Sequence, residues 1–411
     1  MTKLGIMKKN PLISIFCVVF IDLVGFGIII PILPYYAQSF DASATTLGWL
    51  MMCYSAMQFL FAPVWGRISD RVGRRPVLLT TIVGIGLSMF ILSQATSLFW
   101  LFAGRLLAGF FGANISVASA YIADITTPEN RTKGMGIIGA SFGLGFLFGP
   151  ALGGFLSHWG YGAAAGAAAF LSLINFIFAL AQLKEPVLTE EVRFEHRSHF
   201  DKKLLRQTLL EPKTGLPIFL FFLVTLGIAQ LETSFALFLL ARFGLDAMHA
   251  GFILAGMAVI MIAIQGGAIG KLVRRFGEIS LILAGALLMA CSLSAASFAP
   301  SILFFVVALL IHAFGYSMVT PSLSGLVSRH AGNHHQGATM GVYQSAGSLA
   351  RIAGPITAGL LYDHAGIASP FRVAAVLFIC SSVIAMRRLK SSPRKASADR
   401  QWNNQTVANR L

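Results

Sequence analysis

Long apolar runs alternate with short polar connections along the whole of this chain. A helix of about 20 apolar residues crosses the roughly 30 Å of hydrocarbon in a bilayer, and twelve runs come close to that length or exceed it. We expect helices at 12–36, 46–65, 77–95, 98–123, 134–157, 161–183, 215–240, 248–270, 279–298, 301–327, 337–361 and 370–389. The pattern therefore predicts an all-α membrane protein with twelve transmembrane helices.

One polar segment is much longer than the others and divides the chain in two. It mixes acidic, basic and histidine side chains, and six apolar runs lie on each side of it. We predict a six-helix bundle over 1–183, a cytoplasmic linker over 184–214, a second six-helix bundle over 215–390 and a polar cytoplasmic tail over 391–411.

The two halves repeat each other weakly in sequence. The run Gly66–Gly73 after the second helix is echoed by Gly270–Gly277 after the eighth, and the Gly-Pro pair at 149–150 by the pair at 354–355. The two offsets, 204 and 205 residues, agree. Parallel six-helix repeats are typical of transporters whose substrate site lies between the halves. The sequence thus predicts two pseudo-symmetric bundles around a central site.

The distribution of charge adds an orientation. The chain has 411 residues, of which 56% are hydrophobic and 11% charged, with a mean hydropathy of +0.75. A soluble domain carries about 25% charged residues. Of the 31 lysines and arginines, 27 lie on the side of the N-terminus, and basic residues favour the cytoplasmic side. We therefore expect both termini in the cytoplasm, a first helix that is retained rather than cleaved, and no nucleic-acid partner despite the net charge of +15.

The sequence lacks the residue patterns that several kinds of chemistry require. The cysteines, Cys17, Cys53, Cys291 and Cys380, all fall within predicted helices, so neither a disulfide framework nor a metal site is expected. No phosphate-binding loop of the G-x4-GK[ST] type occurs, so the energy for transport is expected from a proton gradient. We expect no enzyme activity and no cofactor. The expected partners of a monomeric chain are protons, a small molecule and the lipid bilayer.

Four charged residues lie inside predicted membrane helices, where a charge costs about 2.5–3.5 kcal/mol on insertion scales. Asp22 lies halfway along the first helix and Glu232 in the middle of the seventh. Either carboxyl can bind a proton or a cationic substrate. The alternatives are a permanent ion pair for Asp22 and hydrogen bonds to neighbouring helices for Glu232. Arg105 either holds Asp22 ionised until a proton or cargo displaces it, or forms a plain ion pair. Arg351 is interpreted as structural, supporting a broken helix or neutralising an acid.

Several motifs along the chain resemble those of a known transporter family. The run GRISDRVGRRPVL from Gly66 to Leu78 is similar to the signature loop of the major facilitator superfamily, and the run from Arg105 to Gly109 resembles the arginine motif of the fourth helix in that family's drug:proton antiporters. The run Asp22 to Gly27, with the prolines that follow, resembles the first helix of the same antiporters, which have twelve helices. The antiporter motif of the fifth helix is matched by Gly136, Gly145, Gly149, Pro150, Gly153 and Gly154. The chain thus resembles bacterial tetracycline and quinolone multidrug exporters with the major facilitator fold.

The resemblance implies an exporter in a bacterial-type cytoplasmic (inner) membrane that exchanges small amphipathic or lipophilic compounds for protons. It implies that Asp22, Glu232 and Arg105 couple transport to protons. It also implies a conformational latch formed by Gly66, Asp70, Arg71, Gly73, Arg74, Arg75 and Asp124. The glycines of this loop are expected to permit a tight turn, and Asp70 is expected to lie against a helix N-terminus of the other half.

Large and polar side chains inside the predicted bundles are candidates for a cargo cavity. Aromatic side chains can adapt to lipophilic cargo, and a buried histidine can relay a proton or make a satisfied polar contact. The candidate set is Phe26, Phe110, Asn114, Phe235, Phe238, His312 and Gln344.

Departures from the family pattern leave the cargo open. The third-helix aspartate of tetracycline exporters falls on Ser88, the ninth helix has no acid after Glu278, and none occurs between residues 301 and 327 in the tenth. The pair Asp22 and Glu232 is therefore a hybrid of two exporter types. Export of an endogenous metabolite, a siderophore or a lipid-like compound is an alternative, as are a proton symporter and a membrane receptor or scaffold that does not transport.

Overall fold

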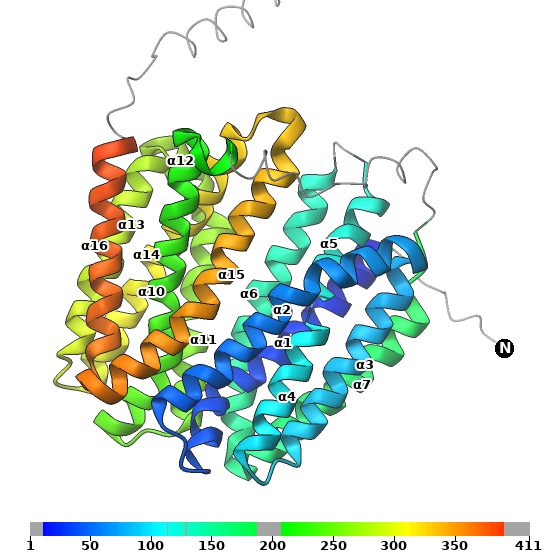
Figure 1. Ribbon diagram of the computed structural model, residues 1–411, viewed down its shortest axis with the longest axis horizontal. Helices are drawn as coiled ribbons and strands as arrows, with labels where there is room; N and C mark the ends of the chain where they lie inside the picture. The colour runs from blue at the N-terminus through cyan, green and yellow to red at the C-terminus, as the bar shows by residue number, and fades with distance from the viewer. Residues whose placement is uncertain (1–10, 113, 128–129, 187–206, 390–411) are drawn as a thin grey trace, which may run out of the picture.

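The structure is a computed structural model, and it describes residues 11–112, 114–127, 130–186 and 207–389. Within these ranges the chain forms long helices that run between two ends of the molecule (Figure 1). The helical elements are α1 (Pro11–Gln38), α2 (Ala44–Val72), α3 (Arg74–Ser93), α4 (Leu98–Phe111), α5 (Asn114–Ile125), α6 (Arg131–Leu156), η1 (Ser157–Trp159), α7 (Tyr161–Gln182), α10 (Pro212–Phe243), α11 (Ala247–Ala263), η2 (Ile264–Ala268), α12 (Ile269–Phe276), α13 (Glu278–Ser297), α14 (Ile302–His330), α15 (Gly332–Ala365) and α16 (Ser369–Leu389). The all-helical fold predicted from the apolar runs is confirmed.

The predicted spans match these elements closely, with two interruptions. Eleven helical stretches of the described chain are long and apolar enough to cross a membrane, and α15, with 34 residues, is the twelfth long helix. The fourth span is divided into α4 and α5. The eighth consists of α11, the five-residue π-helix η2 and α12. A π-helical turn inside a helix is rare and often marks a functional position.

The connection between α2 and α3 differs from the loop expected at Gly66. α2 continues through Gly66 to Val72, and α3 begins at Arg74, so only Gly73 turns the chain, with a φ of 113°. Such a φ is readily adopted by glycine alone. The expectation that both glycines form the turn was wrong. A single glycine costs a helix only about 1 kcal/mol, and nothing at Gly66 forces the backbone out of the helix.

The helices form two bundles that lie side by side (Figure 1). α1 to α7, blue to green in the figure, form the N-terminal bundle, and α10 to α16, green to red, form the C-terminal bundle. The bundles meet mainly through two helix pairs, α6 with α11 and α2 with α15. The exact limits proposed for the bundles stay a prediction. Most of the predicted linker (187–206) and the tail (390–411) lie outside the described residues.

At one end of the molecule the two bundles are joined by hydrogen bonds. We call the end where α2 meets α3 the basic end, and this one the opposite end. At the opposite end the hydroxyl of Tyr35 donates to the carbonyl of Leu245 at 3.2 Å. The backbone N–H groups of Ala44 and Thr45 donate to the carboxylate of Asp363 at 3.2 and 2.8 Å. These bonds tie the N-terminal bundle to the C-terminal bundle.

Toward the basic end the bundles separate. Near the opposite end, a Cβ built on Gly48 would overlap the carbonyl of Pro355, and one on Gly154 would come within 2.9 Å of the carbonyl oxygen of Ala247. Nearer the basic end, a Cβ would meet nothing within 4 Å on glycines of α2, α6, η2, α12 and α15: Gly66, Gly136, Gly139, Gly266, Gly267, Gly270, Gly337 and Gly341. The space between the bundles therefore opens at the basic end.

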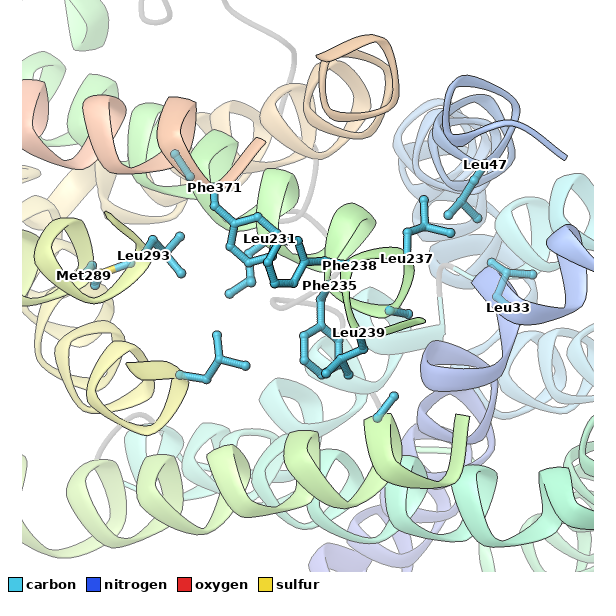
Figure 2. Packing of buried hydrophobic residues seen from close by; sticks show 14 of the residues in the cluster. Leu33, Leu47, Leu231, Phe235, Leu237, Phe238, Leu239, Met289, Leu293 and Phe371 are labelled. Carbon is cyan, nitrogen blue, oxygen red and sulfur yellow. The ribbon is translucent and has the colours of Figure 1, made fainter. Parts of the chain in front are cut away.

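The apolar cores follow the same division. One cluster runs through the C-terminal bundle and continues into the N-terminal bundle, where it includes Leu33 and Leu47. Figure 2 shows these two residues facing Leu237 of α10. A second cluster, around Trp65 and Tyr121, belongs to the N-terminal bundle alone and lies toward the basic end. Within the described residues, Leu33, Leu47 and Leu237 thus join the cores of the two bundles near the opposite end.

Candidate functional site

Asp22 on α1 lies in a closed polar environment inside the N-terminal bundle, and it is 7% exposed. The side-chain amide of Asn114 on α5 donates to its Oδ2 at 2.5 Å. The amide of Asn175 on α7 donates to its Oδ1 at 2.8 Å and to the carbonyl of Val18 at 3.0 Å. Hydrogen bonds to a charged acceptor are stronger than those between neutral groups, so the two amides stabilise an ionised carboxyl. Sequence reasoning missed Asn175, and the available signal was a carboxamide within an apolar span.

Arg105 does not reach Asp22 in this conformation. Its guanidinium lies over the ring of Tyr54 on α2, with Cζ 4.3 Å from the ring centroid, which is a cation–π contact. Arg105 is 5% exposed, and its Nε has no hydrogen-bond partner. Tyr54 lies within electrostatic range of both Arg105 and Asp22. The predicted Arg105–Asp22 ion pair is absent because amides occupy the carboxylate and the arginine stacks on Tyr54.

Glu232 has the opposite environment. Among residues 229–239 of α10, Glu232 alone is exposed. Its electrostatic neighbours are Arg351 on α15 and Tyr316 on α14. On another face α10 packs against α15, where Ala229 contacts Gly354. Because Glu232 is surrounded by groups of the protein and still exposed, we infer that it faces the space between the bundles rather than lipid.

Arg351 is an exposed positive charge next to Glu232. It makes no hydrogen bond or ion pair within the described ranges. Its electrostatic neighbours are Glu232, Tyr316 and Tyr343 of the C-terminal bundle and Tyr54 of the N-terminal bundle. This position favours the interpretation in which Arg351 neutralises an acid. Charged groups of both bundles, namely Asp22, Arg105 and Arg351, therefore lie within electrostatic range of Tyr54.

Some of the predicted cavity residues lie near this centre. The ring of Phe26, which is half-buried, has its centroid 5.4 Å from that of Tyr54. Asn114 holds Asp22, as described above. Gln344 is exposed on α15. It precedes Arg351 by two helical turns, so the two side chains project from the same face of α15.

The other predicted cavity residues pack within the bundles. Phe235 and Phe238, labelled in Figure 2, are 4% and 2% exposed. Both stack on Phe305 in the C-terminal core. His312 is 2% exposed, and its Nδ1 has no partner. Phe110 is half-buried and packs edge-on against aromatic rings of the N-terminal bundle. Apolar periodicity does not distinguish core rings from cavity rings, and Phe235, Phe238 and His312 do not line the central space here.

Arg74 ties several of the predicted latch residues together within the N-terminal bundle. Arg74, which is 3% exposed, contacts the carboxylate of Asp70 at 2.5 Å and that of Asp124 on α5 at 2.8 Å. The backbone N–H groups of Arg74 and Arg75 donate to the carboxylate of Glu185 at 2.6 and 2.9 Å. In this conformation Asp70 therefore pairs with Arg74, and not with a helix N-terminus of the other bundle.

The corresponding connection of the C-terminal bundle is built in a similar way. Gly277, with a φ of 77°, turns the chain between α12 and α13. The next residue, Glu278, is buried and forms an ion pair with Arg329 on α14. Both connections thus combine a glycine at positive φ with a pair between an acid and an arginine. Arg71 of the predicted latch is exposed and takes no part in the contacts described for Arg74.

The glycines of the antiporter motif lie on two faces of α6. One face packs against α1, and the other packs against the C-terminal bundle. Gly145, Gly149 and Gly153 recur every four residues and lie against α1, so that a Cβ on any of them would overlap α1 atoms. Gly154 lies against the start of α11 in the C-terminal bundle. Gly136 has open space around it. Close packing thus accounts for the later glycines of the motif and leaves Gly136 unexplained.

The repeat in α15 reproduces this arrangement with the bundles exchanged. Gly354 lies against α10, and Gly359 lies against the start of α2. A Cβ on Gly48 of α2 would overlap the carbonyl of Pro355, and one on Gly251 of α11 would overlap the carbonyl of Pro150. α6 and α15 therefore occupy equivalent places. Each packs against a helix of its own bundle on one face and against a helix of the other bundle on another face.

Known proteins are similar to this chain over nearly its whole length. The family model of the Major Facilitator Superfamily matches residues 15–355 and 268–408. The tetracycline resistance protein, class B, of Escherichia coli is 33% identical over 354 residues, which cover 84% of this chain and 86% of that protein. Multidrug resistance protein 2 of Bacillus subtilis (strain 168) is 31% identical over 382 residues, covering 90% and 93%.

A solved structure shares the arrangement of both bundles. The human organic anion transporter MFSD10 (TETRAN) is 25% identical to this chain and superimposes with a TM-score of 0.67. The match covers 91% of this chain and 98% of the transporter.

Proposed function

This chain belongs to the major facilitator superfamily, and from this premise we propose that it exports small amphipathic compounds in exchange for protons. The tetracycline and multidrug resistance proteins are similar to this chain over most of its length, and both are named for drug resistance. We propose the same class of transport for this chain, and the proposed cargo is an amphipathic or lipophilic small molecule.

The observation that carries the proposal is the pair of carboxyls within the membrane helices, one in each bundle. Glu232 is exposed beside Arg351, in a molecule whose bundles separate at the basic end. Asp22 is enclosed by two amides. A carboxyl in the hydrocarbon region is costly, and ionisable residues in membrane helices therefore usually have a function. Coupling to a proton gradient requires a site that exchanges protons with only one compartment at a time.

The proposed cycle follows from this arrangement. Positive charge favours the cytoplasmic side, so the basic end is assigned to the cytoplasm, and both termini with it. Glu232 releases its proton to the cytoplasm, cargo binds near Tyr54, and the bundles rock about the two Gly-Pro helices. Protons that bind from the outside then discharge the cargo. The membrane potential supplies about 2.3 kcal/mol per charge for each 100 mV.

The Arg74 network is proposed as the latch of this cycle. Arg74 joins α3 to α2 and α5 through Asp70 and Asp124, so the basic-end part of the N-terminal bundle moves as one body. When the basic end closes, Asp70 can interact with a helix N-terminus of the other bundle only if its ion pair with Arg74 breaks. An element with two alternative partners suits a two-state transition.

The proposal requires no cofactor, because the proton gradient supplies the energy. Among the described residues, no group of three or more histidine, cysteine, aspartate or glutamate side chains could hold a metal ion. The partners proposed are the cargo, protons and the surrounding lipid, with a monomer as the transporting unit.

The test is transport by the purified full-length chain in liposomes with an acidic lumen. Tetracycline, ethidium and fluorescein serve as zwitterionic, cationic and anionic probes. We expect the wild-type chain to accumulate at least one probe against its gradient. Asp22→Asn and Glu232→Gln should each abolish accumulation and keep downhill exchange. Asp41→Asn is the matched control, because Asp41 is exposed outside the helices and its φ of 56° is one that asparagine tolerates.

Two outcomes contradict the proposal. Accumulation of a probe by both Asp22→Asn and Glu232→Gln at the wild-type level would exclude these acids from coupling. Binding of a probe by the purified wild-type chain without any proton release, together with no movement across the liposome membrane, would indicate a receptor or scaffold.

A further inference from the structure

Two charged side chains of the C-terminal bundle face the central space, and neither has an ion-pair partner. Glu232 on α10 and Arg351 on α15 are both exposed. Each lies within electrostatic range of the other. In the described part of the chain neither makes an ion pair or a hydrogen bond. Both therefore offer a charge to a molecule that enters the space between the bundles.

Tyrosines of both bundles indicate that these two charges face the same space. Tyr316 on α14 lies within electrostatic range of Glu232 and of Arg351. Arg351 is also within electrostatic range of Tyr54 on α2, in the other bundle. Both tyrosines are half-buried, and Tyr54 packs against the ring of Phe26. The two charges are thus flanked by aromatic side chains from both bundles.

The packing of α10 against α15 sets how far apart the charges lie. Ala229 of α10 contacts Gly354 of α15. Glu232 lies three residues beyond Ala229 toward the opposite end, and Arg351 lies three residues before Gly354, toward the basic end. At the rise of an α-helix their backbones are therefore about 9 Å apart along the helices. A guanidinium nitrogen of Arg351 would lie 3.6 Å from a Cβ on Gly347, so this charge extends further toward the basic end.

The charges within the membrane helices sum to zero when both acids are ionised. Asp22 and Glu232 are balanced by Arg105 and Arg351. Alternating access passes through a state in which both ends are closed, and an unbalanced charge enclosed in the membrane is costly. A cargo with a net charge adds such an imbalance, whereas a zwitterion adds none.

Exchange for protons sets a second condition on the cargo. A cation that pairs with Glu232 competes with a proton, as exchange requires, but it lies close to the positive charge of Arg351. An anion that pairs with Arg351 binds better once a proton has neutralised Glu232, so it would travel with the proton rather than against it. A neutral compound leaves both charges unpaired when the space closes, which is also costly. A zwitterion alone supplies a partner for each charge and still competes with the proton.

We propose that the cargo is a zwitterion with an apolar body, whose cationic group pairs with Glu232 and whose anionic group pairs with Arg351. This inference rests on the proposed exchange of cargo for protons. The cationic group lies toward the opposite end and the anionic group toward the basic end. The two charges of the cargo lie on separate parts of the molecule, because Glu232 and Arg351 are one helical turn on either side of the contact between α10 and α15. The body of the cargo packs against Tyr54 and Tyr316.

The test is equilibrium binding to the full-length chain in lipid nanodiscs, without any gradient. Three dyes with one xanthene core serve as probes. The free acid of tetramethylrhodamine is a zwitterion at neutral pH, its methyl ester is a cation, and fluorescein is an anion. Fluorescence anisotropy gives each dissociation constant after the signal of empty nanodiscs is subtracted. We expect tetramethylrhodamine to bind at least about 10-fold more tightly than either matched dye, as one hydrogen bond to a charged group predicts.

Two variants assign the charges of the cargo to residues. Arg351→Gln should remove the preference for tetramethylrhodamine over its methyl ester, because the carboxylate then has no partner. Glu232→Gln should remove the preference over fluorescein. Each preference is a ratio measured on one preparation, so a partial loss of folded protein does not change it. Arg372→Gln and Asp41→Asn are the controls, since both residues are exposed outside the central space, and they should keep both preferences.

Three results would overturn the inference. They are equal affinities for tetramethylrhodamine and its methyl ester, no binding of tetramethylrhodamine, and preferences that persist in both Arg351→Gln and Glu232→Gln. In the liposome experiment, accumulation of ethidium or fluorescein as strong as that of tetracycline would also contradict it, and would leave proton exchange intact. A preference for the zwitterion in a chain that accumulates no probe would contradict the proposed exchange alone.

Discussion

The two membrane-embedded acids are held in opposite ways. Asp22 is 7% exposed, and both of its carboxylate oxygens accept hydrogen bonds from buried amides. Glu232 is exposed, accepts no hydrogen bond within the described residues, and has Arg351 as its charged neighbour. The first acid is isolated from water by its own bundle. The second is in contact with the space that opens at the basic end.

The acids also lie at different depths. Gly149 contacts Val24, and its repeat Gly354 contacts Leu226, which aligns α1 with α10. In this alignment Glu232 corresponds to Ile30, eight residues beyond Asp22, or about 12 Å nearer the opposite end at the rise of an α-helix. The acids are thus not copies of one site.

The largest expected difference between the acids is in stability. Asp22→Leu leaves Asn114 and one N–H of Asn175 without an acceptor, and each buried unsatisfied group costs about 1–3 kcal/mol. We expect a loss of roughly 2–6 kcal/mol, seen as a lower Tm in detergent. Glu232→Leu removes an exposed side chain without hydrogen bonds, so its effect should stay within about 0.5 kcal/mol.

Asp22→Asn is the control for this prediction, because its side-chain oxygen can still accept from one of the two amides. Its Tm should lie between those of the wild type and Asp22→Leu. Equal Tm values for Asp22→Leu and Glu232→Leu would remove the distinction between an enclosed acid and an open one.

Most of the fold could be predicted from the sequence, because each transmembrane helix must be apolar over a fixed length. The end of α2 could not, because a glycine such as Gly66 is tolerated within a helix as well as in a turn. Only the positive φ at Gly73 decides where the chain reverses. The repeat of the Gly-Pro pairs was visible in the sequence, and close packing at Gly149 and Gly354 supplies its physical reason.

Charge was the clearest signal in the sequence for the candidate site. A carboxyl in an apolar run stands out, so Asp22 and Glu232 were found. The partner Asn175 carries no charge and is distant in sequence, so only the fold brings it to Asp22. Phe235 and Phe238 show the reverse problem, because a ring that packs in a core and a ring that lines a cavity have the same periodicity.

The next prediction concerns the pH dependence of export. Asn175→Leu removes one donor from the ionised carboxyl of Asp22, and a hydrogen bond to a charged group contributes about 1.5–3 kcal/mol. The proton should then bind Asp22 more tightly, so the pH midpoint of export moves upward by about 1–2 units at 1.36 kcal/mol per unit. The measurement is probe accumulation in liposomes across a series of pH values at a constant gradient.

Ser172→Ala is the matched control on the same helix. Ser172 is buried, and its hydroxyl donates to the carbonyl of Ala168 within α7, without contact with Asp22. This variant should keep the wild-type pH midpoint. A midpoint that does not move in Asn175→Leu would show that the amide of Asn175 positions α7 and has no influence on protonation.

The smallest expected effect belongs to the open acid. Arg351→Gln removes the positive neighbour of Glu232, and an exposed charge pair is worth about 0–1 kcal/mol. The pH midpoint should therefore rise by less than about 0.7 unit. The shift should also shrink between 0.1 and 1 M salt, because the screening length falls from about 10 Å to about 3 Å. The control is Arg372→Gln, since Arg372 is exposed at the opposite end, where it stacks on Phe298. A shift as large as that of Asn175→Leu, and insensitive to salt, would mean that Glu232 and Arg351 form a sealed pair, and the contrast between the two acids would then be lost.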